Sequence, residues 1–536
     1  MGSSAIVRAA PADPPIGLSC PEQMGSFECE LGSNGATAAE VTAVARGDAP
    51  VSVASDALSA MERSAAVVAG LADSAEPAYG VTTGFGSLAT VPIPAGRREE
   101  LQRALIRSHA AGMGPPVERE VVRAMMFLRA RTLAMGWSGT RPVVAETIVA
   151  LLNAGLTPVV PEHGSLGASG DLAPLAHCAL ALIGEGDIDC PDGVRRPAAE
   201  ALSRAGIEAI TLGPKEGLAL INGTDGMLGM LVLASEDLAR LLRVADITAA
   251  MSVEALLGTD RAFAADLIAL RPQPGQASSA ENLRALLADS EIVASHREGD
   301  PRVQDAYSLR CAPQVAGAAR DTLSYADRVA DAELRSAIDN PMVLPDGRVE
   351  SCGNFHGAPL ALACDFLAIA AADVGSIAER RTDRLLDETR SHGLAAFLAE
   401  DPGVNSGLML AHYAQAAMVA ENRRLAAPAG VDSLPTSAMQ EDHVSMGWGA
   451  ARKLRAAVEN LGRILAVELV CAARALDLRA PLRPAPGTAA ALSAVRSVVR
   501  GPGPDRLLAP ELAAAEQLVS SGALLGAVEA RVGALR

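Results

Sequence analysis

The stretch PLALACDFLAIAAADVGSIAERRTDRLLDETR, residues 359–390, is a long apolar pattern with Pro359 at its start and Gly375 as its only glycine. Such a stretch predicts a buried or half-buried helix, because almost nothing inside it interrupts helical hydrogen bonding. The chain of 536 residues is 49% hydrophobic but only 2% aromatic. Sandwich strands favour aromatic and β-branched side chains, so this composition favours close helix–helix packing. We therefore predict an all-α protein.

Further stretches with the same pattern lie on both sides of this one in the second half of the chain. They predict a central bundle of long helices over residues 226–480, with helices at roughly 226–258, 313–335, 358–391, 404–426 and 443–478. An N-terminal region of mixed structure is expected over 35–225 and C-terminal helices over 481–536. Residues 1–34 are rich in Pro, Gly and Ser, which predicts a flexible tail.

The N-terminal region has a less regular pattern. We expect helical structure over 37–72 and over 97–155, the latter with one break at 136–139. A Pro-Asp-Gly turn signal predicts a short hairpin over 187–197. Near the other end, a Pro- and Gly-rich break at 480–504 is expected to precede the terminal helices.

The formal net charge of −17 argues against a nucleic-acid partner, because a phosphate backbone requires a basic face. Eight cysteines without regular spacing do not resemble a disulfide framework. The first residues lack the apolar core of a signal peptide, and no window reaches the roughly 18 charge-free apolar residues of a membrane span. We therefore expect a cytoplasmic protein with reduced thiols and no membrane partner.

The Gly-rich stretch GSLGASGDL, residues 164–172, allows three interpretations. It can be a flexible loop, or an anion cradle at a helix N-terminus. It can also react with itself, because no side chain on Gly170 blocks the approach of its nitrogen to the Ala168 carbonyl. Loss of water would close a five-membered ring, and loss of a second water, from Ser169, would leave an electrophilic methylene. The loop alone does not decide among the three.

The loop is part of a longer signature, GSLGASGDLAPLAH, and other blocks accompany it over roughly residues 35–510. These blocks are YGVTTGFG (79–86), LINGTDGM (220–227), QDAYSLRCAPQV (304–315), AIDNPMV (337–343), GNFHGAP (353–359), SIAERRTDRLLD (376–387) and PTSAMQEDHVSMG (435–447). In content and order they resemble the ammonia-lyases that contain 4-methylideneimidazole-5-one, the histidine, phenylalanine and tyrosine ammonia-lyase family. Several independent matches of this length rarely arise by chance.

This resemblance implies the largely helical ammonia-lyase/fumarase-like fold and a homotetramer whose active sites form where three subunits meet. It also implies the third interpretation of the loop. The cofactor 4-methylideneimidazole-5-one (MIO) would form autocatalytically from Ala168, Ser169 and Gly170, without any external cofactor. The reaction implied is elimination of ammonia by electrophilic and general base catalysis. Residues 35–225 would be the cofactor-bearing catalytic region.

The resemblance also gives roles to four residues of the QDAYSLR and YGVTTGFG blocks. Tyr79 would be the catalytic base that removes the β-proton, which requires a positive local potential because a phenol is a poor base at neutral pH. Arg310 would hold the substrate carboxylate with a bidentate guanidinium. Tyr307, a second catalytic residue, and Gln304 lie three and six residues before it, so a helical turn or compact loop can gather all three.

Two more residues would contact the cofactor or the substrate. Asn222 could simply cap a helix, but the resemblance implies that its amide lies beside the cofactor and the substrate amine. Phe355 would ordinarily be a core residue, and by resemblance it packs near the cofactor and the reacting side chain.

Two positions bear on the substrate. Ser108-His109 resembles the histidine-specific branch of the family, whereas tyrosine-specific members tend to show His-Leu there and phenylalanine-specific members Phe-Leu. Glu441 stands where phenylalanine lyases usually have Gln. Its carboxylate can accept a hydrogen bond from an imidazole N–H, and a phenyl ring cannot satisfy it. We therefore expect His109 and Glu441 to orient L-histidine, with trans-urocanate as product.

Several alternatives stay open. A 2,3-aminomutase shares the fold and the cofactor but adds ammonia back at the β-carbon, and a tyrosine or phenylalanine lyase would use the same scaffold. An inactive helical scaffold would have no reason to keep the whole set of candidate residues. Asp442 and His443 are adjacent, but their spacing is not a zinc pattern, so we predict no metal site.

Overall fold

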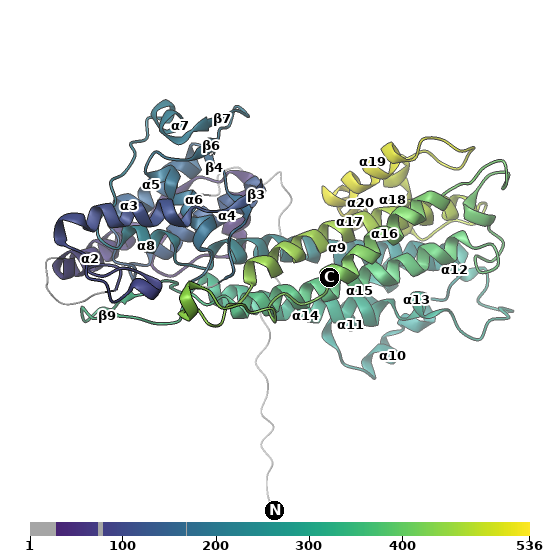
Figure 1. The fold of residues 1–536 in the computed structure, drawn as a ribbon. Coiled ribbons are helices and arrows are strands. Elements are labelled where there is room, and N and C mark those ends of the chain that lie inside the picture. The colour runs from purple at the N-terminus through teal and green to yellow at the C-terminus, as the bar shows by residue number, and fades with distance from the viewer. Residues whose placement is uncertain (1–27, 73–78, 168) are drawn as a thin grey trace, which may run out of the picture.

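The computed structural model describes residues 28–72, 79–167 and 169–536. Residues 1–27 of the predicted tail, and Ala168 of the predicted cofactor loop, lie outside the described residues. The protein is elongated, with an N-terminal body at one end and a bundle of long helices extending from it (Figure 1). Among the described residues, strands form only two- and three-stranded sheets. The predicted all-α fold class is confirmed.

The N-terminal body is built from short helices joined by loops and small β-ladders. Its elements are β1 (Cys29–Leu31), α1 (Ala38–Gly47), β2 (Val51–Val53), α2 (Ser55–Ala72), η2 (Gly86–Leu88), η3 (Ala95–Arg97), α3 (Arg98–His109), β3 (Met113–Pro116), α4 (Arg119–Ala134), α5 (Pro142–Asn153), β4 (Thr157–Pro158), β5 (Pro161–His163), α6 (Leu172–Leu182), β6 (Asp187–Asp189), β7 (Arg195–Pro197), α7 (Ala198–Ala205) and α8 (Glu216–Ile221). β1 and β2 pair in parallel, β3 pairs with β5, and β6 lies between β4 and β7. The β6–β7 ladder, which joins Asp187 to Pro197, confirms the predicted hairpin.

The sequence pattern missed three features of this body. The predicted helix over 97–155 is wrong at residues 110–118, where β3 separates α3 from α4. Two glycines and two prolines in AAGMGPPV make this break, because proline cannot donate a helical hydrogen bond. Similarly, β2 divides the stretch 37–72 into two helices. Residues 29–31, at the end of the predicted tail, pair with β2 as strand β1.

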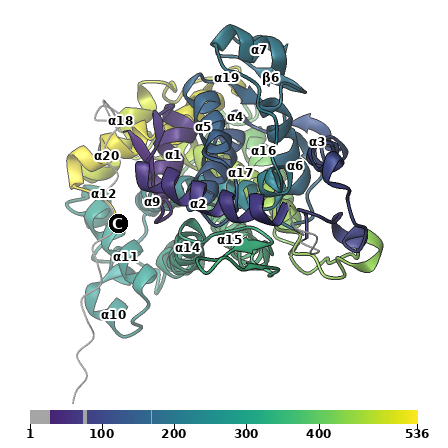
Figure 2. The same cartoon turned by 90° about the vertical axis from the view of Figure 1, so that its left-hand side faces the viewer.

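The bundle and the C-terminal helices contain the long elements. They are α9 (Asp225–Ala255), η4 (Arg261–Phe263), α10 (Ala265–Ala269), α11 (Pro274–Leu287), α12 (Glu291–Ala294), α13 (Tyr307–Arg310), α14 (Ala312–Leu334), β8 (Met342–Val343), β9 (Val349–Glu350), α15 (Ala358–Leu386), η5 (Ala396–Leu398), α16 (Met409–Leu425), η6 (Ser437–Met439), α17 (Gly447–Asp477), α18 (Pro486–Arg496), α19 (Ala509–Ser520) and α20 (Ala523–Val532). α17 packs against both α9 and α15, and α14 packs against α11 and α15. Figure 2 looks along the molecule and shows α14 and α15 on one side and α18 and α20 on another.

Three of these helices form the axis of the molecule. α9, α15 and α17 have 31, 29 and 31 residues, which corresponds to about 45 Å each. By length and composition α15 alone among the described helices could cross a membrane, but 61% of its apolar window is buried inside the protein. A core helix of this kind needs a continuous apolar surface because it is packed on several sides. The apolar surface of α15 is therefore explained by its position inside the bundle.

The predicted bundle helices are confirmed, but two of them start later than predicted, and one helix lies in the predicted break that follows them. α16 begins at Met409 rather than near 404, because the amides of Ser406 and Gly407 donate to the Asp505 carboxylate instead of entering the helix. α17 begins at Gly447 rather than near 443. The preceding Met446 donates its backbone N–H to the Leu166 carbonyl, so this segment is tied to the predicted cofactor loop. The predicted break at 480–504 is wrong where it contains α18, which Pro486 opens at its first turn.

Candidate active site

A cavity of about 510 Å³ opens in the N-terminal body and gathers five of the predicted residues. They come from five separate segments: the turn before η2, the end of α3, the loop before α6, the end of α8, and the turn after η6. The five residues are Tyr79, His109, Ser169, Asn222 and Glu441. Residues more than 350 positions apart in the sequence therefore share one pocket.

The loop that carries Ser169 is tightly folded. Ser169 has φ +52°, a left-handed conformation that non-glycine residues rarely adopt, and Gly170 has φ +75°. A Cβ on Gly170 would lie 1.9 Å from the Gly223 carbonyl oxygen, so only glycine fits there. The Ser445 hydroxyl donates to the Gly167 carbonyl at 3.1 Å and ties the loop to the segment before α17. The loop is thus constrained from two sides and is not the flexible loop of the first interpretation.

Asp171 holds the loop in place from within the core and is fully buried. Its carboxylate accepts hydrogen bonds from the Ser165 hydroxyl at 2.8 Å and from the Met227 backbone N–H at 2.9 Å. Burial raises the pKa of Asp171 to about 7, although these two hydrogen bonds act in the opposite direction. The carboxyl therefore joins the loop to the first turn of α9.

Asn222 ends α8 and is only 2% exposed. Its Nδ2 group donates to Asp339 Oδ1 at 3.2 Å and to the Asn340 carbonyl at 2.9 Å. Both neighbours only accept, so the orientation of the amide is fixed by its partners. Oδ1 is buried and has no hydrogen-bond partner in the part of the chain that the structure describes. Asn222, which lines the cavity, thus keeps one acceptor without a partner among the described residues.

Asp339 is itself held by a buried ion pair. Lys215 Nζ lies 2.7 Å from Asp339 Oδ2, and both side chains are fully buried. Lys215 also donates to the Ser138 carbonyl at 3.0 Å. The sequence analysis gave neither residue a role. A signal was present, because the chain has only two lysines, Lys215 and Lys453, and Lys215 stands in the apolar stretch LGPKEGLALI.

Tyr79 lies at the cavity wall, where its phenol oxygen accepts a hydrogen bond from the Gly86 backbone N–H at 3.0 Å. Its ring packs edge-on against Phe85, with centroids 6.2 Å apart. The N–H from η2 and the aromatic contact together fix where the phenol oxygen lies. The donor is the first backbone N–H of the short helix η2, whereas Arg310 is not among the residues that line this cavity.

His109 and Glu441 line the cavity from two separate segments, the end of α3 and the turn after η6. His109 Nδ1 lies 2.9 Å from the Leu105 carbonyl oxygen, so in the neutral ring Nδ1 carries the proton and Nε2 is an acceptor. Burial lowers the pKa of His109, and the charge of Glu441 only partly offsets this effect. Glu441 Oε2 accepts a hydrogen bond from the Thr436 hydroxyl at 2.8 Å.

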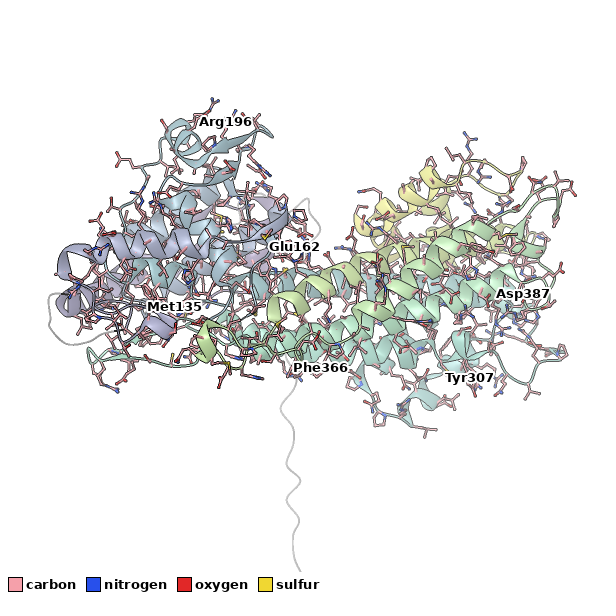
Figure 3. The ribbon with its side chains drawn as sticks, viewed as in Figure 1. Met135, Glu162, Arg196, Tyr307, Phe366 and Asp387 are labelled. Atoms are coloured by element: carbon pink, nitrogen blue, oxygen red, sulfur yellow. The ribbon has the colours of Figure 1, made fainter. Side chains whose placement is uncertain are left out.

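The remaining predicted residues do not line the cavity. Tyr307 and Arg310 form α13, at the end of the bundle away from the N-terminal body (Figures 1 and 3). Tyr307 is 72% exposed, and Gln304 is exposed just before it. The Arg310 guanidinium stacks 4.7 Å from the Tyr307 ring centroid. The predicted turn therefore does bring Tyr307 and Arg310 together, but far from Tyr79 and Ser169.

Two features of α13 bear on its role. Arg310 Nε is buried and lacks a hydrogen-bond partner among the described residues. Tyr307, next to it, presents an aromatic ring to solvent. This guanidinium nitrogen thus lies beside an exposed aromatic ring, and a buried polar atom without a partner calls for an explanation.

Phe355 lies in the turn before α15 and is half-buried. This turn packs on the segment before α17: His356 Nε2 is 3.2 Å from the His443 carbonyl oxygen, and the His356 and His443 rings stack. The same segment holds the cofactor loop through Ser445. Phe355 is thus in the neighbourhood of the loop, although it does not line the cavity.

Among residues 28–72, 79–167 and 169–536, no three His, Cys, Asp or Glu side chains cluster as metal ligands would. The seven described cysteines are free, and the buried ones, Cys29, Cys178, Cys364 and Cys471, have a raised pKa because burial disfavours the thiolate. The chemistry of the cavity therefore rests on a phenol, an imidazole, a carboxylate, an amide and the Ser169 loop.

Comparison with known proteins gives the context of this site. A model of the aromatic amino acid lyase family matches residues 36–497. The histidine ammonia-lyase of Streptomyces avermitilis is 62% identical over 506 residues, which cover 94% of this chain and 99% of that protein. The crystal structure of tyrosine aminomutase from Streptomyces globisporus has a TM-score of 0.90 at 38% identity and covers 95% of this chain and 100% of its own. For histidine ammonia-lyase from Trypanosoma cruzi the TM-score is 0.87 at 39% identity, with 94% and 96% covered. The chain belongs to the aromatic amino acid lyase family.

Proposed function

We propose that the protein eliminates ammonia from L-histidine to give trans-urocanate. The observation that carries this proposal is the cavity in which Ser169, Tyr79 and Asn222 face His109 and Glu441. The first three residues supply groups for an elimination, and the last two supply acceptors for an imidazole. The 62% identity to a histidine ammonia-lyase supports the same substrate.

The Ser169 loop fits the cofactor that we propose, 4-methylideneimidazole-5-one formed from Ala168, Ser169 and Gly170. Ring closure requires a tight turn and a residue without a side chain at the attacking nitrogen. Ser169 has a left-handed φ, and the wall at Gly223 leaves no space for a Cβ on Gly170. Once formed, the group supplies an electrophilic methylene that takes up the substrate amine and turns it into a better leaving group.

The substrate ring would be held by two acceptors in its imidazolium form, in which both ring nitrogens carry a proton. His109 Nδ1–H donates to the Leu105 carbonyl, which leaves Nε2 to accept a hydrogen bond from an N–H of the substrate ring. Because burial lowers its pKa, His109 stays neutral at neutral pH and keeps this acceptor. Glu441 provides the second acceptor, and an unpaired carboxylate there would penalise a phenyl or phenol side chain.

Tyr79 and Asn222 would act on the reacting atoms. The Gly86 N–H holds the phenol oxygen in the cavity, where it can take the β-proton. Asn222 has used its Nδ2 protons on Asp339 and Asn340, so only its Oδ1 can meet the substrate. An oxygen acceptor suits an amine or ammonium N–H and would orient the nitrogen that leaves.

The substrate carboxylate needs a partner that the cavity of one chain does not provide, because its lining contains no arginine or lysine. We propose that Arg310, Tyr307 and Gln304 of another copy supply it, in a homotetramer with shared active sites. The exposure of Tyr307 and the unpartnered Nε of Arg310 support this assignment. A guanidinium suits the task because it binds a carboxylate with two parallel hydrogen bonds.

We further propose that the enzyme works in the cytoplasm. The net charge of −17 and the free cysteines suit a reducing compartment. The membrane-length helix α15 has most of its apolar window inside the bundle, which leaves it poorly suited to lipid contact.

The test is an assay of purified protein with L-histidine, followed by the ultraviolet absorbance of urocanate, with Ser169→Ala measured in parallel. The native protein should produce urocanate and ammonia, and the variant should lose at least about 1000-fold in rate. No urocanate from the native protein would contradict the proposal.

A 2,3-aminomutase is the second candidate, because a tyrosine aminomutase has nearly the same fold. The same assay separates the two functions, since an aminomutase acting on L-histidine would give β-histidine, which chromatography of the products would show. Fold similarity does not favour an aminomutase over a lyase, because the structure of histidine ammonia-lyase from Trypanosoma cruzi matches almost equally well. His109 and Glu441 favour histidine as the substrate.

A further inference from the structure

Glu441 is carried by a turn that is closed on itself. The Thr436 backbone N–H donates to the Glu441 carbonyl at 2.9 Å, and the Glu441 N–H donates back to the Thr436 carbonyl at 3.3 Å. The Thr436 hydroxyl adds a third link, to Glu441 Oε2 at 2.8 Å. The first and last residues of the turn are therefore joined through both backbone and side chain.

The turn between them is strained. Ser437, Ala438 and Met439 have φ values of +50°, +52° and +71°, three consecutive non-glycine residues in the left-handed region. Each such residue costs about 1 kcal/mol or more and persists only where surrounding contacts enforce it. Strain of this kind is concentrated at functional sites, and here it lies in the wall of the cavity.

The turn also meets the loop that holds Tyr79. A Cβ on Gly86 would lie 2.8 Å from Ser437 Oγ, so the two segments touch where Gly86 has no side chain. Gly86 is the residue whose N–H binds the Tyr79 phenol. Glu441 and Tyr79 are therefore placed relative to each other through the contact between η2 and η6.

We propose that Thr436 is a positioning residue for substrate recognition, whose hydroxyl occupies Glu441 Oε2 and leaves Oε1 for the imidazole N–H of the substrate. The proposal rests on the proposed function, because it concerns recognition of an imidazole. No hydrogen bond from within the described chain reaches Oε1. The hydroxyl must be the donor here, because an ionised carboxylate only accepts.

The hydroxyl limits the freedom of a side chain that would otherwise rotate about three bonds. A charge-assisted hydrogen bond is about twice as strong as a neutral one, so a single hydroxyl is enough to fix the carboxylate. The other titratable groups of the cavity are Tyr79 and His109, and His109 is the one that interacts with the Glu441 charge. Neither bonds to the Glu441 carboxylate, which leaves Thr436 as its described side-chain partner.

The test is Thr436→Val, with Thr436→Ser as the matched control. Val has the same shape as Thr, and Thr436 has extended backbone angles, φ −133° and ψ −178°, that suit a β-branched residue. Ser restores the hydroxyl. We expect Thr436→Val to lower kcat/KM for L-histidine about tenfold, mainly through KM, and Thr436→Ser to change it less than about threefold.

A double-mutant cycle with Glu441→Gln separates positioning from a general structural role. If Thr436 acts through Glu441, the Val substitution should cost less than about twofold in the Glu441→Gln background. An equal loss in both backgrounds, or a Val variant with native kinetics, would overturn the proposal. Thr436→Ala removes the same hydroxyl and replaces Val in the cycle if the Val variant has an altered melting temperature.

The outcomes also distinguish this inference from the proposed function. Native protein that converts L-histidine, with a Val variant that does so equally well, refutes the role of Thr436 alone. Native protein that does not convert L-histidine refutes both. The binding of urocanate, measured by calorimetry, gives a readout without turnover and should weaken about tenfold in Thr436→Val but not in Thr436→Ser.

Discussion

The cavity in the N-terminal body and the surface around α13 carry the two halves of the predicted site, and they are built differently. In the cavity, each key side chain has partners within the chain: Asn222 binds Asp339, Tyr79 binds Gly86, and Glu441 binds Thr436. At α13, Tyr307 is exposed, and Arg310 has a buried nitrogen that finds no acceptor in the described part of the chain.

The two regions therefore differ in how firmly the chain itself holds their side chains. Groups that must be held to within a fraction of an ångström for proton transfer are enclosed by their own fold. The groups that we propose to complete the site in another copy lie on a short helix, α13, at the far end of the bundle. The comparison predicts that substitutions in the cavity region change both stability and activity, whereas substitutions at α13 change activity alone.

The largest effect is expected for Lys215→Met, which leaves Asp339 as an unpaired buried charge. Breaking a buried ion pair by removing one partner costs about 3–5 kcal/mol of unfolding free energy. Lys453→Met is the matched control, because Lys453 is partly exposed and its partner Asp365 also accepts two backbone N–H groups. Chemical denaturation should show a clearly smaller loss for Lys453→Met. Equal losses of unfolding free energy would mean that the Lys215–Asp339 pair, which holds Asn222, contributes no more to stability than the Lys453–Asp365 pair.

The second effect is a pH dependence that arises from Asp171, beside the cavity loop. The pKa of Asp171 is about 7 in the folded protein, against about 3.9 for an ordinary aspartate. Asp171 therefore loses its proton at about pH 4 in the unfolded chain but only at about pH 7 in the folded protein. Between these two pH values the bound proton stabilises the folded state, and this stabilisation decreases as the pH rises. The unfolding free energy of native protein relative to Asp171→Asn should decrease by about 2–3 kcal/mol between about pH 5 and 7 and then stay constant. A difference that does not vary with pH would contradict the buried carboxyl.

At α13 we expect a loss of activity without a loss of stability. Arg310→Met should lower kcat/KM for L-histidine about 100-fold, mainly through KM, because it removes two charge-assisted hydrogen bonds to the carboxylate. The melting temperature should not change, since no described residue forms an ion pair with Arg310. Arg310→Lys should recover only part of the loss, because lysine lacks the planar fork. An unaltered KM for Arg310→Met would remove α13 from the site.

The smallest effect compares two tyrosines by the same substitution. Tyr79→Phe leaves the Gly86 N–H without its acceptor and should cost about 1 kcal/mol of unfolding free energy. Tyr307→Phe removes a hydroxyl from an exposed ring and should stay within about 0.5 kcal/mol of the native value. A reversed order, measured by denaturation of both variants, would contradict the distinction between the two regions.

The fold class and the main bundle helices could be predicted from the sequence because long apolar periods have few alternatives. The pattern identified α9, α14 and α15 to within a few residues, apart from the C-terminal end of α15. It did not locate the start of α17, because the preceding residues pair with Leu166, far away in the sequence. It also missed β3 and α18, where Gly and Pro content has to be weighed against contacts that only the folded chain provides.

The candidate site was predictable as a set of residue types and not as a geometry. The motifs contained Tyr79, Ser169 and Glu441, but no spacing could show that Thr436 binds Glu441 or that Gly86 binds Tyr79. Lys215 was missed because its role depends on Asp339, which lies 124 residues later. Nor could the sequence show that α13 and the cavity lie at opposite ends of the folded molecule.

The measurement that tests the account most directly is complementation between two defective variants. Tyr79→Phe damages the cavity and Arg310→Met damages α13, so each homo-oligomer should be nearly inactive. Co-expression with two different affinity tags, followed by purification of mixed oligomers, should restore activity at about a quarter of the sites, where an intact cavity meets an intact α13 from another copy. Mixed oligomers no more active than the average of the two variants would show that the two regions do not form one site between subunits.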